Sequence, residues 1–125
     1  KLYEEKVTEE YQVSINDLIT ILKGRCLTSE SGLNREIQYV FCCDCKKVVK
    51  EKGSQDYAWV NSDVDKSSID LALEKSMSCI IIPYDLPIDD NVVNYAISFS
   101  FPIISTAYSS YKICSKIYEA FKERT

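Results

Sequence analysis

The pattern of hydrophobic and polar positions first becomes regular near the start of the chain, where it predicts a short helix. Apolar residues recur there at helical spacing, at Ile15, Leu18, Ile19 and Leu22. Ser14 can cap the helix while Asp17 reaches back to the free amides of its first turn, and Gly24 can supply a left-handed stop. The pattern therefore predicts an amphipathic helix over residues 15–23.

Short strands and helices are then expected to alternate to the end of the chain. The predicted strands cover residues 25–28, 36–41, 57–60, 79–82 and 103–105. The predicted helices cover residues 45–52, capped by Asp44 and stopped by Gly53, and residues 67–75, 90–99 and 109–123. Cys45, Val48 and Val49 are expected on the inner face of the first of these helices.

Two of the predicted strands are unbroken apolar runs, Cys79 to Ile82 and Pro102 to Ile104. Such runs are typical of strands that helices cover on both faces. The predicted fold is therefore an α/β three-layer sandwich with a mostly parallel five-stranded sheet flanked by helices. Residues 1–12 are expected to form a charged leader, and residues 13–125 a single domain.

Charge and composition exclude several functional classes. The chain has 15 Lys and Arg against 19 Asp and Glu, a net charge of −4, so no nucleic-acid partner is expected. It has no histidine, the commonest base and metal ligand, which argues against most familiar hydrolases. No apolar run is long enough for a membrane span, and a reducing, cytoplasmic context without membrane association is expected.

A predicted parallel sheet also predicts where a ligand would bind. In open α/β sheets the ligand crevice lies beyond the carboxyl ends of the strands. The loops there contain small polar or aromatic residues, and no lysine or arginine to neutralise phosphate. In the predicted site, hydroxyls and an amide bind the ligand, a tyrosine ring stacks on it, and an aspartate holds its loop. The candidates are Asn61, Ser62, Tyr84, Ser105, Thr106 and the loop-holding Asp44.

The sharpest local motif is the cluster of Cys42, Cys43 and Cys45 between a predicted strand and a predicted helix. Thiolates at such a junction suit soft metals or redox exchange, but a structural zinc site needs a second pair of ligands. Packing as small apolar residues is therefore the preferred interpretation. Asp63, Asp65, Asp89 and Asp90 could supply a carboxylate pair for acid–base work or magnesium. Because Asp65 and Asp89 or Asp90 precede predicted helices, helix capping is the preferred interpretation of these residues.

An aromatic stripe runs along the last predicted helix, comprising Tyr108, Tyr111, Tyr118 and Phe121 with Cys114 and Ile117 between them. Core packing is the preferred interpretation of the stripe. The chain contains nine tyrosines, and tyrosine is enriched at interfaces. Part of the stripe could therefore face a second copy, and a homodimer is expected.

Several strings, in order, resemble the DRTGG domain, an α/β module similar to the amino-terminal domain of HPr kinase. They are Val13 to Leu18, Gly32 to Ile37, Asp44, Ile80 to Ile82 with Asp85 to Pro87, and Pro102 to Thr106. Asn34 and Asp85 stand where the family commonly has Asp and Gly. Where many members carry Thr, His and Asn after the third strand, this chain carries Asn61, Asp65 and Ser67.

The resemblance implies a regulatory or dimerisation module without established catalytic residues. Such domains occur beside phosphate acetyltransferases and between the nucleotide-sensing modules of regulated pyrophosphatases. The expected function is a non-catalytic module that senses a small ligand such as an adenine nucleotide, without cofactor or metal. Its expected partners are a second copy and a regulated enzyme or nucleotide-sensing module, fused or separate. The alternative is a metal-binding or redox protein that uses Cys42, Cys43 and Cys45.

Overall fold

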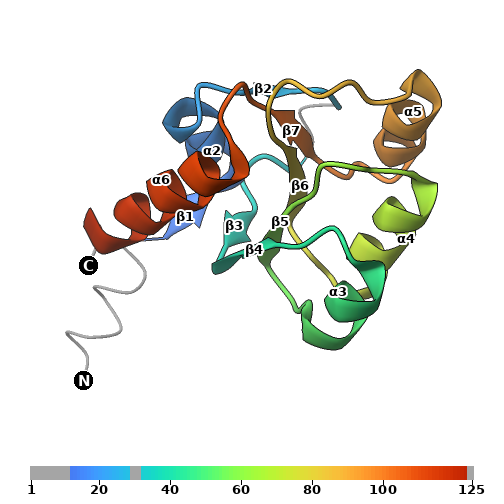
Figure 1. Cartoon of the computed structure of the whole chain (residues 1–125), viewed down its shortest axis with the longest axis horizontal. Coiled ribbons are helices and arrows are strands. Elements are labelled where there is room, and N and C mark those ends of the chain that lie inside the picture. Colours follow the sequence, from blue (N-terminus) through green and yellow to red (C-terminus); the bar gives the residue numbers. More distant parts are fainter. Residues whose placement is uncertain (1–11, 29–31, 124–125) are drawn as a thin grey trace.

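A computed structural model describes residues 12–28 and 32–123 of the chain, so all but Gln12 of the predicted leader lies outside the described residues. Four adjacent parallel strands make up most of its main sheet (Figure 1). They are β4 (Tyr39–Cys42), β5 (Tyr57–Val60), β6 (Cys79–Ile82) and β7 (Ile103–Ser105). The short β2 (Arg25–Cys26) pairs antiparallel with β7 and completes the order β2-β7-β6-β5-β4.

A second, two-stranded sheet pairs β1 (Val13–Ser14) with β3 (Glu36–Ile37). The single strand predicted over residues 36–41 is therefore divided, because β3 pairs with β1 while β4 starts at Tyr39 in the main sheet. The predicted strand at 25–28 is confirmed only at Arg25–Cys26. The mostly parallel five-stranded sheet is confirmed.

Helices cover both faces of the main sheet (Figure 1). One core cluster joins α2 (Ile15–Ile21) and α6 (Ser110–Glu123) to the face that carries Ala58, Val60 and Ile81. The other joins α3 (Lys46–Lys52), α4 (Lys66–Glu74) and α5 (Asp90–Ser98) to the face that carries Trp59, Ile80 and Ile82. Strand residues alternate between the two clusters, as the period of a strand requires. The three-layer sandwich is confirmed.

Side-chain caps begin four of the helices, including α6, where the Ser109 hydroxyl accepts from the Lys112 N–H at 3.0 Å. Ser14 and Asp17 form the predicted capping box of α2. Asp65 forms a capping box with Ser68 at the start of α4, and Asp89 caps α5 by accepting a hydrogen bond from the Asn91 N–H. The interpretation of Asp65 and Asp89 as helix caps is confirmed.

The two glycines predicted as left-handed stops do not have that conformation. After α2 the left-handed residue is Lys23, with φ 48°. A Cβ on Gly24 would lie 2.8 Å from the backbone oxygen of Ser105, so a close approach to β7 explains this glycine. Gly53 is extended, with φ −66°, and a Cβ there would lie 2.6 Å from the Val49 oxygen.

Two predicted inner faces are only partly buried. In α3, Val49 is buried, whereas Val48 is 39% exposed and Cys45 is exposed, since this helix is short and covers the edge of the sheet. In α6, the buried residues are Ile113, Ile117 and Ala120. Core packing of the whole aromatic stripe is wrong, because Tyr111 and Tyr118 are 84% and 65% exposed.

Candidate functional site

The six predicted site residues lie at or just after the carboxyl ends of β4, β5, β6 and β7. These ends lie along one edge of the sheet because the four strands are parallel and adjacent. The structure divides the six residues into two groups. Asp44, Asn61 and Ser62 belong to the loops after β4 and β5. Tyr84 and Thr106 belong to the loops after β6 and β7, and Ser105 is the last residue of β7.

Asp44 joins two neighbouring loops. Its Oδ1 accepts a hydrogen bond from the Ser62 N–H at 3.0 Å, and its Oδ2 accepts one from the Ser62 hydroxyl. The prediction that Asp44 caps the following helix is wrong: the N-cap of α3 is Cys45, which makes no side-chain cap. The Asp44 carboxylate instead binds Ser62 in the neighbouring loop, because β4 and β5 are adjacent in the sheet.

Asn61 is buried at the end of β5, with 1% of its surface exposed. Its backbone N–H donates to the Ile81 oxygen at 3.1 Å, and its Oδ1 accepts from the Asp63 N–H at 2.8 Å. The amide Nδ2 has no hydrogen-bond partner. A buried amide without a partner costs about 1–3 kcal/mol, so this donor requires an explanation.

The Thr106 hydroxyl is already committed within the fold. Thr106 is 2% exposed, and its Oγ1 donates to the Leu22 oxygen at 2.7 Å while accepting from the Tyr108 N–H at 3.2 Å. These bonds tie the end of β7 to the end of α2 and to the residues before α6. Thr106 therefore stabilises the segments around the site, and its hydroxyl proton is not free for a ligand.

Tyr84 lies in a strained loop after β6. Tyr84 and Asp85 both have positive φ, 59° and 49°. The Tyr84 N–H donates to the Tyr108 oxygen and the Asp85 N–H to the Thr106 oxygen, both at 2.9 Å. These bonds hold a conformation that a bulky side chain seldom adopts. The Tyr84 side chain is 60% exposed, which leaves a ring accessible beside the ends of β6 and β7.

Two clefts open near this edge. The larger, about 450 Å³, lies between the amino ends of α4 and α5 and is lined by Asp65, Lys66, Ser67, Asp89, Asn91 and Val92. The smaller, about 310 Å³, lies beside β7 and includes Arg25, Asp85 and Ser105. Among the predicted residues, Ser105 alone lines one of these two clefts.

Sequence reasoning therefore missed the cationic members of these clefts. Lys66 lies directly after the predicted cap Asp65, a position that could have suggested it. Arg25 has no such signal, because only the antiparallel pairing of β2 with β7 brings it to this edge. Arg25 Nη1 lies 3.9 Å from Asp85 Oδ1, with both side chains exposed.

The carboxylate of Asp65 is the most perturbed acid of this edge. Burial works to raise its pKa, but hydrogen bonds from Ser67, Lys46 and Ser68 outweigh it and hold the pKa well below the ordinary value. Lys46 Nζ lies 2.9 Å from Asp65 Oδ2. Asp65 is thus ionised at neutral pH and adds negative charge to the larger cleft.

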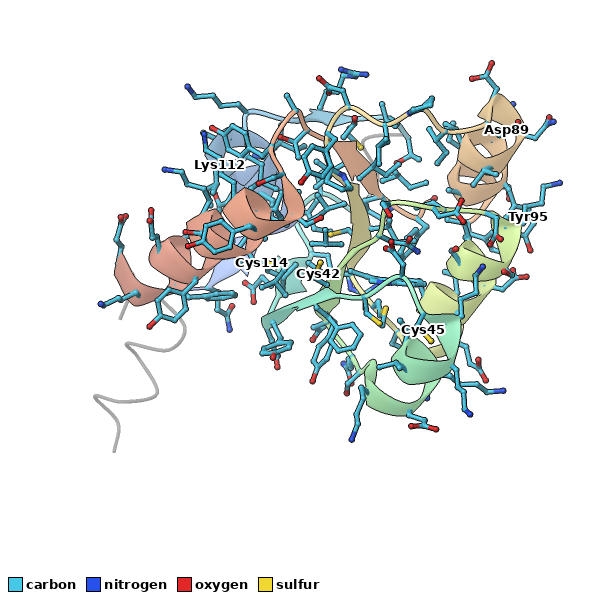
Figure 2. The ribbon with its side chains drawn as sticks, in the orientation of Figure 1. Cys42, Cys45, Asp89, Tyr95, Lys112 and Cys114 are labelled. Carbon is cyan, nitrogen blue, oxygen red and sulfur yellow. The ribbon has the colours of Figure 1, made fainter. Side chains whose placement is uncertain are left out.

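The structure separates the cysteines of the predicted cluster. Cys43 packs against the core cluster on the α3 side, and its backbone oxygen accepts from Trp59 Nε1 at 2.7 Å. Cys42 instead lies beside Cys114 of α6, on the opposite face of the sheet (Figure 2). Within residues 12–28 and 32–123, no three Cys, Asp or Glu side chains are grouped to hold a metal ion. The geometry therefore does not support the metal-binding alternative.

A family model, the DRTGG domain, matches residues 17–120, which is most of the chain. This chain belongs to the DRTGG domain family. Its fold matches a solved structure from Clostridium perfringens with a TM-score of 0.72 and 13% sequence identity. That structure contains the CBS and DRTGG domains of the regulatory region of a pyrophosphatase, complexed with the activator diadenosine tetraphosphate.

The match covers 91% of this DRTGG domain and 49% of the pyrophosphatase chain, so this chain spans about half the length of the protein that it resembles. Curated protein sequences give no match. Among the described residues of this DRTGG domain, no helix is both long and apolar enough to cross a membrane.

Proposed function

We propose that this DRTGG domain is a non-catalytic regulatory module that binds a small polar ligand at the carboxyl ends of its parallel strands. Adenine nucleotides are the first ligand class to test. The domain passes on the occupancy of this site to a regulated enzyme or to a nucleotide-sensing module, fused or separate. Support for such a partner comes from the pyrophosphatase regulatory region, in which a DRTGG domain accompanies CBS domains.

The observation that carries the proposal is the unpartnered Nδ2 of Asn61. Other polar groups at this edge have partners in the fold, since Asp44 binds Ser62, and Thr106 binds Leu22 and Tyr108. Among the described residues, Asn61 Nδ2 is the one buried side-chain polar atom without a partner, which makes it a specific feature of this edge. A ligand acceptor that reaches Nδ2 would recover the cost of burying it.

The charges around the clefts indicate which part of a nucleotide would be bound. Lys66 lines the larger cleft together with Asp65 and Asp89, and Arg25 lines the smaller one together with Asp85. Carboxylates thus offset the cation in each cleft, which disfavours a highly charged polyphosphate. We expect the base and ribose to supply most of the affinity, with Tyr84 as the stacking ring.

Isothermal titration calorimetry with adenosine, AMP, ATP and diadenosine tetraphosphate tests this proposal. We expect binding in which additional phosphates bring little gain. Asn61→Asp keeps the acceptor for the Asp63 N–H but deletes the Nδ2 donor, and should weaken binding about tenfold. Asn94→Asp, at an exposed position of α5, is the matched control. An absence of heat near millimolar ligand, or equal affinity of Asn61→Asp and the control, would count against the proposal.

A second function, self-association through α6, is favoured by the exposure of its aromatic residues. Tyr111 and Tyr118 are 84% and 65% exposed, and tyrosine is enriched at protein interfaces. Sedimentation velocity should show a concentration-dependent dimer that the double substitution Tyr111→Glu and Tyr118→Glu converts to a monomer. A dimer that survives this double substitution would place the interface elsewhere.

A further inference from the structure

Two cysteines from distant parts of the chain meet between β4 and α6. Cys42 ends β4, and Cys114 lies in the second turn of α6. Figure 2 shows their side chains next to one another, where α6 packs against β4. Both are free thiols in the structure.

The strand and helix patterns explain why these two residues meet. Val40 packs against the core cluster that contains α6, and Cys42, two residues later, lies on the same face of β4. Cys114 packs against the same cluster, next to the buried Ile113. The meeting of the thiols is therefore a consequence of the packing of α6 on the sheet.

The two thiols differ in access to solvent. Cys42 is exposed, whereas Cys114 is half-buried. Burial, with a smaller contribution from Cys42, raises the pKa of the Cys114 thiol. An oxidant from solvent therefore reaches Cys42 first, and Cys114 lies in position to react with the product.

We propose that Cys42 and Cys114 form an oxidation site at which a hydroperoxide converts the thiol pair into an intramolecular disulfide. The Cys42 thiolate attacks the peroxide oxygen, the O–O bond breaks, and Cys42 becomes a sulfenic acid as hydroxide leaves and takes up a proton. The Cys114 sulfur then displaces the hydroxyl from the Cys42 sulfur, and the proton lost by Cys114 leaves with it as water. With hydrogen peroxide, two thiols are oxidised and one peroxide is reduced to two waters.

The proposed site uses only one cysteine of the cluster at residues 42, 43 and 45. Cys43 packs on the opposite side of the sheet, and its thiol interacts with the Cys45 backbone oxygen at 3.6 Å. Cys42 is also two residues from Asp44, which holds the Ser62 loop. The disulfide would join α6 to the strand that leads into the candidate ligand site, independently of what that site binds.

The full chain, treated with hydrogen peroxide and then alkylated, should lose two free thiols and the mass of two hydrogens. Non-reducing peptide mapping should assign the new link to Cys42 and Cys114. The oxidised protein should melt roughly 5–15 °C higher, because the bond closes a long loop between ends already in contact. Reduction with dithiothreitol should restore the original melting temperature.

Three single substitutions make the assignment specific. Cys114→Ser and Cys42→Ser should abolish the loss of two thiols, whereas Cys45→Ser, at an exposed position in the same cluster, should leave it unchanged. Six free thiols after oxidation, a link within residues 42–45, a link between two chains, or a lower melting temperature would each overturn the proposal. Folding of each variant is checked by circular dichroism before oxidation.

Discussion

Replacing Asp65 shows most directly how charge at the carboxyl ends of the strands affects the stability of the fold, because its carboxylate interacts with three different side chains. Oδ1 accepts hydrogen bonds from the Ser68 N–H at 2.9 Å and from the Ser67 and Ser68 hydroxyls at 2.7 and 3.0 Å. Oδ2 lies 2.9 Å from Lys46 Nζ. Asp65→Ala removes the helix cap and the ion pair together, whereas Asp65→Asn keeps an acceptor for the cap and removes the negative charge.

The expected losses follow from these contacts. Loss of an N-cap costs about 1 kcal/mol of the free energy of unfolding. The ion pair adds only about 0.2–1 kcal/mol, because the Lys46 and Asp65 side chains are 39% and 55% exposed. Asp65→Ala should therefore lower the free energy of unfolding by about 1–2 kcal/mol, and Asp65→Asn by less than about 1 kcal/mol.

The effect of Asp65→Asn should depend on pH with a defined sign. Burial opposes ionisation, but the hydrogen bonds of Ser67, Lys46 and Ser68 lower the pKa of the native carboxyl below the ordinary value of 3.8. A lowered native pKa stabilises the fold at pH values above 3.8, and this stabilisation is lost as the pH falls from there toward the native pKa. The difference between wild type and Asp65→Asn should therefore be full near neutral pH and shrink under acid conditions.

Urea denaturation followed by the fluorescence of Trp59, the single tryptophan, measures these differences. Asp63→Asn is the matched control, since the described hydrogen bonds of Asp63 use its backbone N–H and not its carboxylate. A stability difference for Asp65→Asn that is unchanged from neutral to acid pH would refute the electrostatic reasoning. Equal stability of Asp65→Ala and wild type would refute the capping role.

Three further substitutions test the frame of the site, each by urea denaturation. Gly24→Ala should lower the free energy of unfolding by about 1–3 kcal/mol, because its Cβ would lie 2.8 Å from the Ser105 oxygen; no loss would mean that β7 can move. Thr106→Val should cost about 1–3 kcal/mol by leaving the Leu22 oxygen without its donor, and a neutral effect would contradict that bond. Tyr84→Gly should change stability by less than about 1 kcal/mol, since glycine relieves the positive φ while adding freedom to the unfolded chain. It should nevertheless weaken ligand binding, and unchanged affinity would remove the stacking role.

Local signals in the sequence were sufficient to predict most of the fold. The run from Cys79 to Ile82 is a central strand because residues that are apolar on both faces need cover on both faces. The cap residues Ser14 and Asp65 act within one helical turn, so neighbouring residues already define them. The DRTGG resemblance rested on strings of this local kind, and the family match confirms it.

Features that depend on contacts between distant segments could not be predicted in this way. Gly24 is required by the approach of β7, which lies about eighty residues later in the chain, and not by the conformation of Gly24 itself. The partner of Asp44 is Ser62 on the neighbouring strand, although the helix after Asp44 offered a simpler role as a cap. The lining of the clefts by Lys66 and Arg25 likewise depends on how α4, α5 and β2 are placed.

The hydrogen bonds at the carboxyl ends of the strands determine how well ordered the loops of the candidate site are. Bonds from Ser62 to Asp44, from Thr106 to Leu22 and from Asp85 to the Thr106 oxygen join neighbouring loops before any ligand is present. A ligand would then have little loop ordering to bring about, which favours binding to a preformed surface. Because Asn61 Nδ2 is the buried side-chain donor left unpartnered among the described residues, occupancy should act first on the β5–α4 loop. Asp44 links that loop to the end of β4, where Cys42 contacts α6. Ligand binding and thiol oxidation would therefore both act on the carboxyl end of β4.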